Sequence, residues 1–116
     1  MKSRSVIISL VAFAAGLVLS QANALAASAE KGKSAFLQHG CWQCHGYEGQ
    51  GRITGPKLAP GPIPFETLSN FVRTTSRQMP PFSKDILSDE DLADIYAYLA
   101  AVPKGPDPKD IPLLNP

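Results

Sequence analysis

Two cysteines and a histidine lie close together in the segment Cys41-Trp42-Gln43-Cys44-His45 of this 116-residue chain. Cysteines three positions apart on one helical turn face the same way, so both thiols can add to the two vinyl groups of one haem. The residue that follows, His45, can then bring a ring nitrogen to the iron. The spacing Cys-x-x-Cys-His therefore predicts covalent attachment of one haem c through Cys41 and Cys44, with His45 as the proximal iron ligand.

Two other kinds of site use the same residue types. A redox-active dithiol also has the spacing Cys-x-x-Cys, but it is typical of a βαβ pattern, and neither flank of this segment has that pattern. A structural zinc site needs four ligands. The available ligands are Cys41, Cys44, His45 and His39, which are crowded into one short segment with no second ligand pair downstream. We favour haem attachment and keep the dithiol and the zinc site as alternatives.

The N-terminal residues have the pattern of a secretory signal peptide. Lys2 and Arg4 precede an apolar run from Val6 to Leu19, and a segment of small residues with an A-x-A cleavage pattern follows. The run is shorter than the roughly 20 residues that a membrane-spanning helix needs, which favours a cleaved signal over an uncleaved anchor. We expect residues 1–26 to be removed, the mature chain to be periplasmic, and no membrane span to remain.

Composition limits the possible partners of the mature chain. Loss of Lys2 and Arg4 changes the formal charge from +1 to −1, and haem propionates would add further negative charge. Nucleic acid is therefore not an expected partner. The remaining chain is one small domain over residues 27–102, whose thin core a buried haem would complete, followed by a proline-rich tail over residues 103–116. We expect a monomer.

The second axial ligand of the iron determines whether the haem transfers electrons or binds small ligands. Apart from Met1, which leaves with the signal peptide, Met79 is the one methionine in the chain. It lies in Arg77-Gln78-Met79-Pro80-Pro81-Phe82, where two prolines fix φ and no helix face would bury a gap-filling methionine. We expect Met79 to be the second iron ligand. His39 is the rival, but its position close to His45 in sequence places it on the same side of the attachment turn.

Three longer helical segments are expected between loops rich in glycine and proline. The first runs from about Ala29 to His39, with Ser28 as its N-cap and Gly40 in a left-handed turn after its end. The second runs from about Pro64 to Thr75, with Pro64 in its first turn. The apolar residues on one face of this second helix are interpreted as core packing; they are Phe65, Leu68, Phe71 and Val72.

The third helix has the clearest start and stop signals. Ser88 can cap it, and it should end near Val102, before Pro103. Acidic residues crowd its first turn and Leu87 can pack back onto it. An apolar stripe follows at helical spacing, with Tyr96 and Tyr98 at its margins; its members are Leu92, Ile95, Leu99 and Val102.

No alternating strand pattern competes with these three helices, so the expected fold class is all-α. The tail is expected to be extended, either lying on the domain through Ile111, Leu113 and Leu114 or loose.

The order of these motifs resembles class I cytochrome c, specifically the small single-haem periplasmic cytochromes of bacteria. The resemblance covers residues 29 to 102, approximately. It rests on four segments: Cys41 to Gly46, then Gly49 to Leu58 with its Thr54-Gly55-Pro56-Lys57-Leu58 stretch, then Arg77 to Phe82, then Leu92 to Leu99. The resemblance implies the cytochrome c fold, with three main helices and loops wrapped around one covalently bound haem.

The resemblance also implies roles for particular residues. The first and last helices would cross where Gly32 and Phe36 meet Ile95 and Tyr98, with Gly32 allowing the backbones to approach closely. The carbonyl of Pro56 would accept a hydrogen bond from Nδ1 of His45 and fix the ring, and Leu58 would line the haem pocket.

A six-coordinate iron has no open position for a substrate. We therefore expect a carrier that passes single electrons through the Fe(III)/Fe(II) couple, not an enzyme. The expected partners are redox proteins: a periplasmic dehydrogenase as donor and a cytochrome or oxidase as acceptor, each met through a small patch at the haem edge. Two alternatives stay open. One is a cytochrome subunit tightly bound to a periplasmic dehydrogenase or oxidase complex, with the tail as its dock. The other is a haem-based ligand sensor or peroxidase-like enzyme with a displaceable Met79.

Charged side chains are expected to steer these encounters. The basic ones, near the haem edge, are Arg52, Lys57, Arg73, Arg77 and Lys84. The acidic ones, at the last helix, are Asp85, Asp89, Glu90, Asp91 and Asp94. This separation of charge predicts a molecular dipole.

Overall fold

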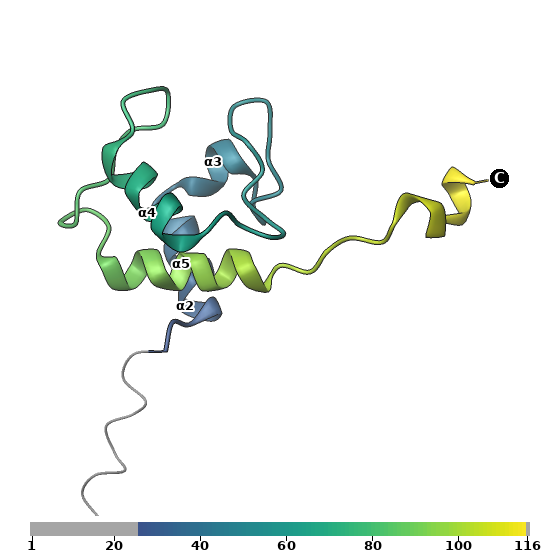
Figure 1. Ribbon diagram of the computed structural model, residues 1–116, viewed down its shortest axis with the longest axis horizontal. Coiled ribbons are helices and arrows are strands. Elements are labelled where there is room, and N and C mark those ends of the chain that lie inside the picture. The colour runs from purple at the N-terminus through teal and green to yellow at the C-terminus, as the bar shows by residue number, and fades with distance from the viewer. Residues whose placement is uncertain (1–25, 116) are drawn as a thin grey trace, which may run out of the picture.

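The computed structural model describes residues 26–115, so the predicted signal peptide lies outside the described residues except for its last position. Four α-helices form the body of the domain (Figure 1): α2 (Ala29–Gln38), α3 (Cys41–His45), α4 (Phe65–Thr74) and α5 (Asp89–Ala101). Residues 26–115 contain no β-strand, only an isolated bridge between Arg52 and Gly55. The predicted all-α fold is confirmed. No helix in this part of the chain is long and apolar enough to cross a membrane.

Helices α2 and α5 begin at the predicted caps. The hydroxyl oxygens of Ser28 and Ser88 each accept a hydrogen bond from the backbone N–H three residues later, which satisfies one of the free donors of a helix N-terminus. Helix α2 ends before Gly40, which adopts the predicted left-handed conformation with φ of 74°. Helix α5 ends at Ala101, one residue before the predicted end and two before Pro103.

Helices α2 and α5 cross with their backbones in contact. A Cβ atom built on Gly32 would overlap the carbonyl oxygen of Asp94 and lie 2.8 Å from the backbone nitrogen of Ile95. One turn further along α2, the rings of Phe36 and Tyr98 pack with their centroids 5.6 Å apart. The helix crossing that the resemblance implied is therefore confirmed, and glycine is the residue that lets the two backbones meet.

The core of the domain forms along one face of α5. Leu92, Ile95 and Leu99 of the predicted stripe are buried, and so is Leu87, which precedes the cap. Tyr98 was expected at the margin of this stripe but is buried. Its hydroxyl donates a hydrogen bond of 2.9 Å to the carbonyl of Tyr47, which ties the loop after α3 to α5.

Helix α4 differs from the prediction in two respects. Pro64 is the N-cap and not a residue of the first turn, so the helix starts one residue later. Leu68 and Val72 are buried, but the side chain of Phe71 is 49% exposed. The interpretation of Phe71 as a core residue is wrong, because Leu68 and Val72, four positions apart, form the buried side of α4 and Phe71 lies outside it.

The C-terminal tail leaves the end of α5 and runs away from the other helices (Figure 1). It ends in two 3₁₀ turns, η1 (Pro108–Asp110) and η2 (Pro112–Leu114), which contact each other but none of the helices α2 to α5. The side chain of Asn115 closes this unit, donating hydrogen bonds to the carbonyls of Pro108 at 2.8 Å and Ile111 at 3.1 Å. Of the two predicted arrangements, the one in which the tail lies on the domain is not observed.

Candidate haem-binding site

The short helix α3 contains both cysteines and the histidine of the Cys-x-x-Cys-His segment. The left-handed turn at Gly40 lets α3 follow directly on α2, and α3 packs against α2, the helix that crosses α5. Cys41 is partly buried and Cys44 is exposed, on the same helical turn. His45 is the last residue of α3, and its side chain is buried.

The structure gives little support to the two other uses of these cysteines. Burial raises the pKa of the Cys41 thiol to about 11, so this thiol is neutral near pH 7, whereas a redox-active dithiol depends on a thiolate. Within residues 26–115, no three His, Cys, Asp or Glu side chains are grouped so that they could hold a metal ion. His39 lies toward α5 instead, with its Nε2 atom 3.9 Å from Oδ2 of Asp91.

The ring of His45 is held by the loop that follows α3. Its Nδ1 atom lies 2.8 Å from the carbonyl oxygen of Pro56, so the hydrogen bond that the resemblance implied is present. A carbonyl oxygen only accepts, so the proton of the neutral imidazole is on Nδ1. Nε2 of His45 then keeps its lone pair, and no hydrogen bond of the described residues uses it. This is the arrangement by which a backbone carbonyl orients a metal-binding histidine.

Gly55 allows that loop to lie against α3, a role that the sequence analysis did not assign. A Cβ atom at Gly55 would lie 2.6 Å from the carbonyl oxygen of Cys44 and 3.0 Å from Nδ1 of His45. Next to it, the hydroxyl of Thr54 donates a hydrogen bond of 3.3 Å to the same carbonyl of Cys44. The signal for this role was the glycine immediately before Pro56, because a close backbone approach needs a residue without a side chain.

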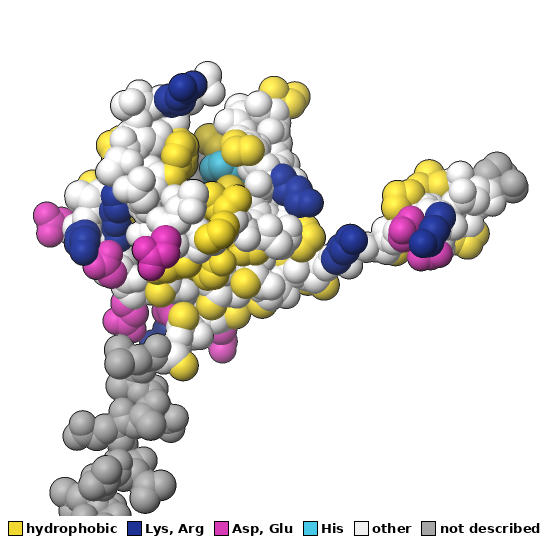
Figure 2. Space-filling view, in the orientation of Figure 1, with side chains coloured by type: hydrophobic (Ala, Val, Ile, Leu, Met, Phe, Trp, Pro, Cys, Tyr) yellow, Lys and Arg dark blue, Asp and Glu magenta, His cyan; other side chains and the backbone are white. Residues whose placement is uncertain are grey.

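A hollow with hydrophobic side chains around it opens in the surface of the domain, and a histidine side chain is visible inside it (Figure 2). The loop after α3 and the loop after α4 rise on its two sides (Figure 1). Met79 and Leu58 are half-buried and pack against the hydrophobic core. Other half-buried apolar side chains against the same core are Cys41, Trp42, Phe65, Phe82, Tyr96 and Val102.

Comparison with protein families agrees with this geometry. The sequence profile of the family described as cytochrome c oxidase, cbb3-type, subunit III matches residues 27–99, which is more than half of the chain. The chain belongs to this family of c-type cytochromes. No curated protein and no solved structure matches the chain. The predicted recognition as a cytochrome c is confirmed, and membership of the family implies a covalently bound haem c and haem-based electron transfer.

Three observations indicate that the residues of this cytochrome can hold a haem. One turn of α3 presents both thiols, as covalent attachment needs. His45 is oriented by Pro56 and has a free Nε2 atom, as an iron ligand needs. Leu58 and Met79, which the sequence places at the haem, are half-buried apolar side chains packed against the core, as the faces of a porphyrin need. Each of these is a property of the chain's own residues.

Two of the charged residues predicted to steer docking have partners inside the domain. Arg73 and Lys84 both bind the carboxylate of Asp89, at 3.0 and 2.7 Å, and these hydrogen bonds, that of Lys84 first, hold the pKa of Asp89 below its usual range. Asp94 is buried and accepts a hydrogen bond of 2.6 Å from the backbone N–H of Ser28. The interpretation of Arg73 and Asp94 as free docking charges is wrong, because both are used inside the domain.

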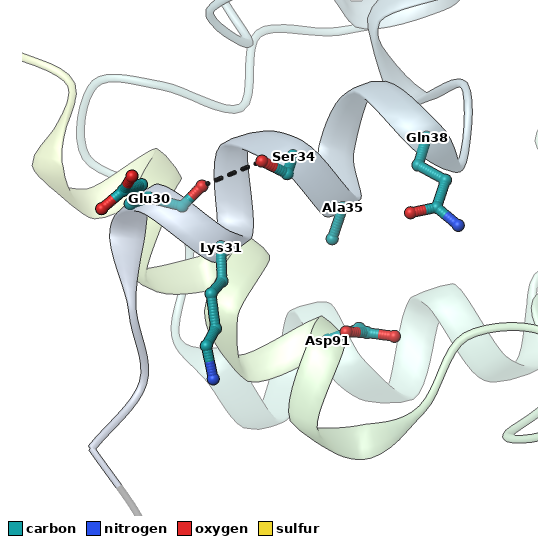
Figure 3. A pocket seen from close by; sticks show the side chains of 6 residues that line it. All are labelled: Glu30, Lys31, Ser34, Ala35, Gln38 and Asp91. Carbon is teal, nitrogen blue, oxygen red and sulfur yellow. Dashed lines mark hydrogen bonds between the residues drawn. The ribbon is translucent and has the colours of Figure 1, made fainter.

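A separate surface pocket lies beside the crossing of α2 and α5 (Figure 3). It is lined by Glu30, Lys31, Ser34, Ala35, Gln38 and Asp91. These side chains are mostly polar, and none of them belongs to the predicted haem site. The pocket therefore has the wrong chemistry for a porphyrin, which needs apolar walls.

Proposed function

We propose that this chain is a single-electron carrier whose one haem c is attached through Cys41 and Cys44 and ligated by His45 and Met79. The observation that carries the proposal is the orientation of His45, which is buried at the end of α3 and donates a hydrogen bond from Nδ1 to the carbonyl of Pro56. When bound, the haem supplies a one-electron Fe(III)/Fe(II) couple. No group in the domain is then required to move a proton or to bind a substrate.

The residues around the site orient the ligands and exclude water. The carbonyl of Pro56 keeps the imidazole in one orientation and makes it a better donor to a metal. Leu58 and Met79 present apolar surface to the haem, and the thioether of Met79 is a soft ligand that favours the ferrous state. We propose that both effects raise the reduction potential relative to a site with two histidines.

Replacing Met79 tests this function. Met79→Ala should leave the haem attached, abolish the Met-to-iron charge-transfer band and lower the reduction potential by at least about a tenth of the roughly 0.8 V that axial ligands span. Met79→Leu should give the same result, because it keeps the side-chain volume and removes the sulfur. The measurements are the mass of the secreted protein, its absorbance spectrum and a redox titration. An unchanged spectrum and potential in both variants would show that Met79 is not a ligand.

The wild-type protein distinguishes the carrier from a ligand sensor or peroxidase-like enzyme. A carrier with both axial positions filled should bind carbon monoxide slowly in the ferrous form at neutral pH. Rapid binding by the wild type, together with the absence of the Met-to-iron band, would favour the sensor or enzyme.

We further propose that residues 1–26 are a cleaved signal peptide and that the mature cytochrome acts in the periplasm. A dehydrogenase would supply its electrons, and a cytochrome or an oxidase would accept them. The N-terminal sequence pattern supports the location, and the family to which the chain belongs supports an oxidase on the accepting side.

A second candidate function is that of a fixed subunit in an oxidase complex. Two observations favour it: the description of the family, and the tail, which projects the side chains of Leu113 and Leu114 into solvent at 92% and 62% exposure. The tail lies beyond the residues that match the family, and its tip is closed by its own hydrogen bonds. Such a tip can insert into an apolar groove of another subunit at a low entropic cost.

Changing the two exposed leucines tests the second candidate. If the tail is the dock, Leu113→Asp with Leu114→Asp should weaken association with the larger complex at least about tenfold, since each buried leucine contributes about 1.5–3 kcal/mol. The measurement is size-exclusion chromatography of the native host extract. Ile53→Asp is the matched control, because Ile53 is a fully exposed apolar residue on the body of the domain. Elution of the wild type as a free monomer would contradict a fixed subunit.

A further inference from the structure

Arg73, in the last turn of α4, binds the segment that follows the Met79 loop. Its Nη1 atom donates to the carbonyl oxygens of Phe82 at 2.9 Å, Ser83 at 3.2 Å and Leu87 at 2.7 Å. Its Nη2 atom donates to Oδ1 of Asp89 at 3.0 Å. The side chain is only 15% exposed, and its buried Nε atom has no hydrogen-bond partner among the described residues. An arginine held in this way is a structural clamp, because its charge is directed to backbone carbonyls.

The loop that carries Met79 is attached to α4 at both of its ends. At the first end, the backbone N–H of Thr75, a buried residue, donates to the carbonyl of Phe71 at 2.9 Å. At the other end, the N–H of Phe82 donates to the carbonyl of Val72, also at 2.9 Å. Between these ends, residues 76–81 make one hydrogen bond within the described part of the chain, a long one of 3.5 Å to the hydroxyl of Thr75. The backbone of the Met79 loop is therefore held by hydrogen bonds mainly at its two ends, while the side chain of Met79 packs against the core.

The far end of the loop has the closer connection to Met79. Pro80 and Pro81 lie between Met79 and Phe82, and each has its φ angle fixed by the proline ring. The position of Phe82 is therefore transmitted to Met79 through a stiff segment. The side chain of Phe82 packs against the core, its N–H bonds to Val72, and its carbonyl is held by Arg73.

We propose that Arg73 is a positioning residue that keeps Met79 on the iron by clamping the far end of its loop. The inference rests on the proposed ligation by Met79. It predicts that weakening the clamp raises the population of a state in which the loop is open and the sixth position of the iron is free. An external ligand binds that state, so its apparent dissociation constant falls in proportion as the open fraction rises.

The experiment measures the affinity of the ferric holoprotein for imidazole, which competes with Met79. The deciding variant is Arg73→Lys, which keeps the charge but cannot reproduce the planar fork that reaches several acceptors. We expect its apparent dissociation constant for imidazole to fall about tenfold, because at least one hydrogen bond to a charged group is lost. Lys84→Gln is the matched control, since Lys84 shares Asp89 with Arg73 and makes no bond to the loop carbonyls. It should stay within about twofold of the wild type.

A double-mutant comparison separates positioning from general stability. In the Met79→Ala background the sixth position is already open, so Arg73→Lys should change imidazole affinity by less than about twofold. An effect of the same size in both backgrounds, or no effect in the wild-type background, would overturn the inference. If Arg73→Lys gives no holoprotein, Asp89→Asn loosens the guanidinium without removing it and should shift affinity in the same direction by a smaller factor.

Failure of the inference can be told apart from failure of the proposed function. If the wild type and Met79→Ala bind imidazole equally well, Met79 is not a ligand and the proposed ligation is wrong. If Met79→Ala binds imidazole more tightly than the wild type but Arg73→Lys binds it like the wild type, Met79 is an iron ligand and Arg73 does not keep it on the iron.

Discussion

Gly32→Ala is expected to destabilise the holoprotein by about 3 kcal/mol or more, the upper end of the cost of overpacking a core. Helix propensity alone predicts the opposite sign, since alanine is favoured over glycine in a helix interior by about 1 kcal/mol. The close approach of the two helices determines the sign of the stability change. The new methyl group would overlap the carbonyl oxygen of Asp94, and that carbonyl belongs to helix backbone that cannot rotate away. The helices would have to separate, and the midpoint of chemical unfolding measures the loss.

Gly105→Ala is the matched control for this substitution. A Cβ atom at Gly105, in the tail, would meet no atom within 4 Å, and its φ is not positive. We expect its effect on stability to be within about 0.5 kcal/mol. Equal unfolding midpoints for the two variants would mean that α2 and α5 do not meet backbone to backbone.

The parts of the fold that could be predicted from the sequence depend on local signals. Ser28, Ser88 and Gly40 act through residues within one turn of themselves, so their roles can be read without knowledge of the partners. The same holds for the attachment segment, in which both thiols and the imidazole lie on one short helix. In these places the chemistry and the local conformation are specified by the same few residues.

The parts that could not be predicted depend on long-range partners. Arg73 and Asp94 look like ordinary surface charges on amphipathic helices, but Arg73 binds carbonyls 9 to 14 residues away and Asp94 binds the N–H of Ser28, 66 residues away. Phe71 fits the apolar spacing of α4 yet remains about half exposed, at 49%. Spacing predicts which face of a helix is apolar, whereas burial depends on what packs against that face.

The orientation of His45 falls between these two cases. The residue that holds its ring, Pro56, is 11 residues away, and its role was predicted from the family resemblance and not from spacing. The glycine beside it carried a local signal, because a glycine followed by a proline marks a turn where backbones can approach closely. The site thus combines a helix whose chemistry is local with a loop whose position depends on the tertiary fold.

His45→Ala is expected to prevent the accumulation of stable holoprotein, lowering its yield tenfold or more. Loss of an outer partner of a metal-binding histidine typically costs about 10–100-fold in affinity, and loss of the ligand itself should cost at least as much. The substitution would also remove the hydrogen-bond partner of the Pro56 carbonyl, which weakens the contact between the loop and α3. Intact mass and haem absorbance of the secreted protein give the yield of haem-containing chain.

His39→Ala is the matched control, because His39 is the other histidine of the chain and was the rival candidate for an iron ligand. The structure places its Nε2 atom 3.9 Å from Oδ2 of Asp91, at the contact between α2 and α5, so its loss should remove one weak contact and leave the haem in place. If His39→Ala lost the haem and His45→Ala kept it, the proximal ligand would be His39. The hydrogen bond between His45 and Pro56 would then only stabilise the loop. Because only the ring of His45 combines burial, a fixed tautomer and a position next to Cys44, we expect the reverse.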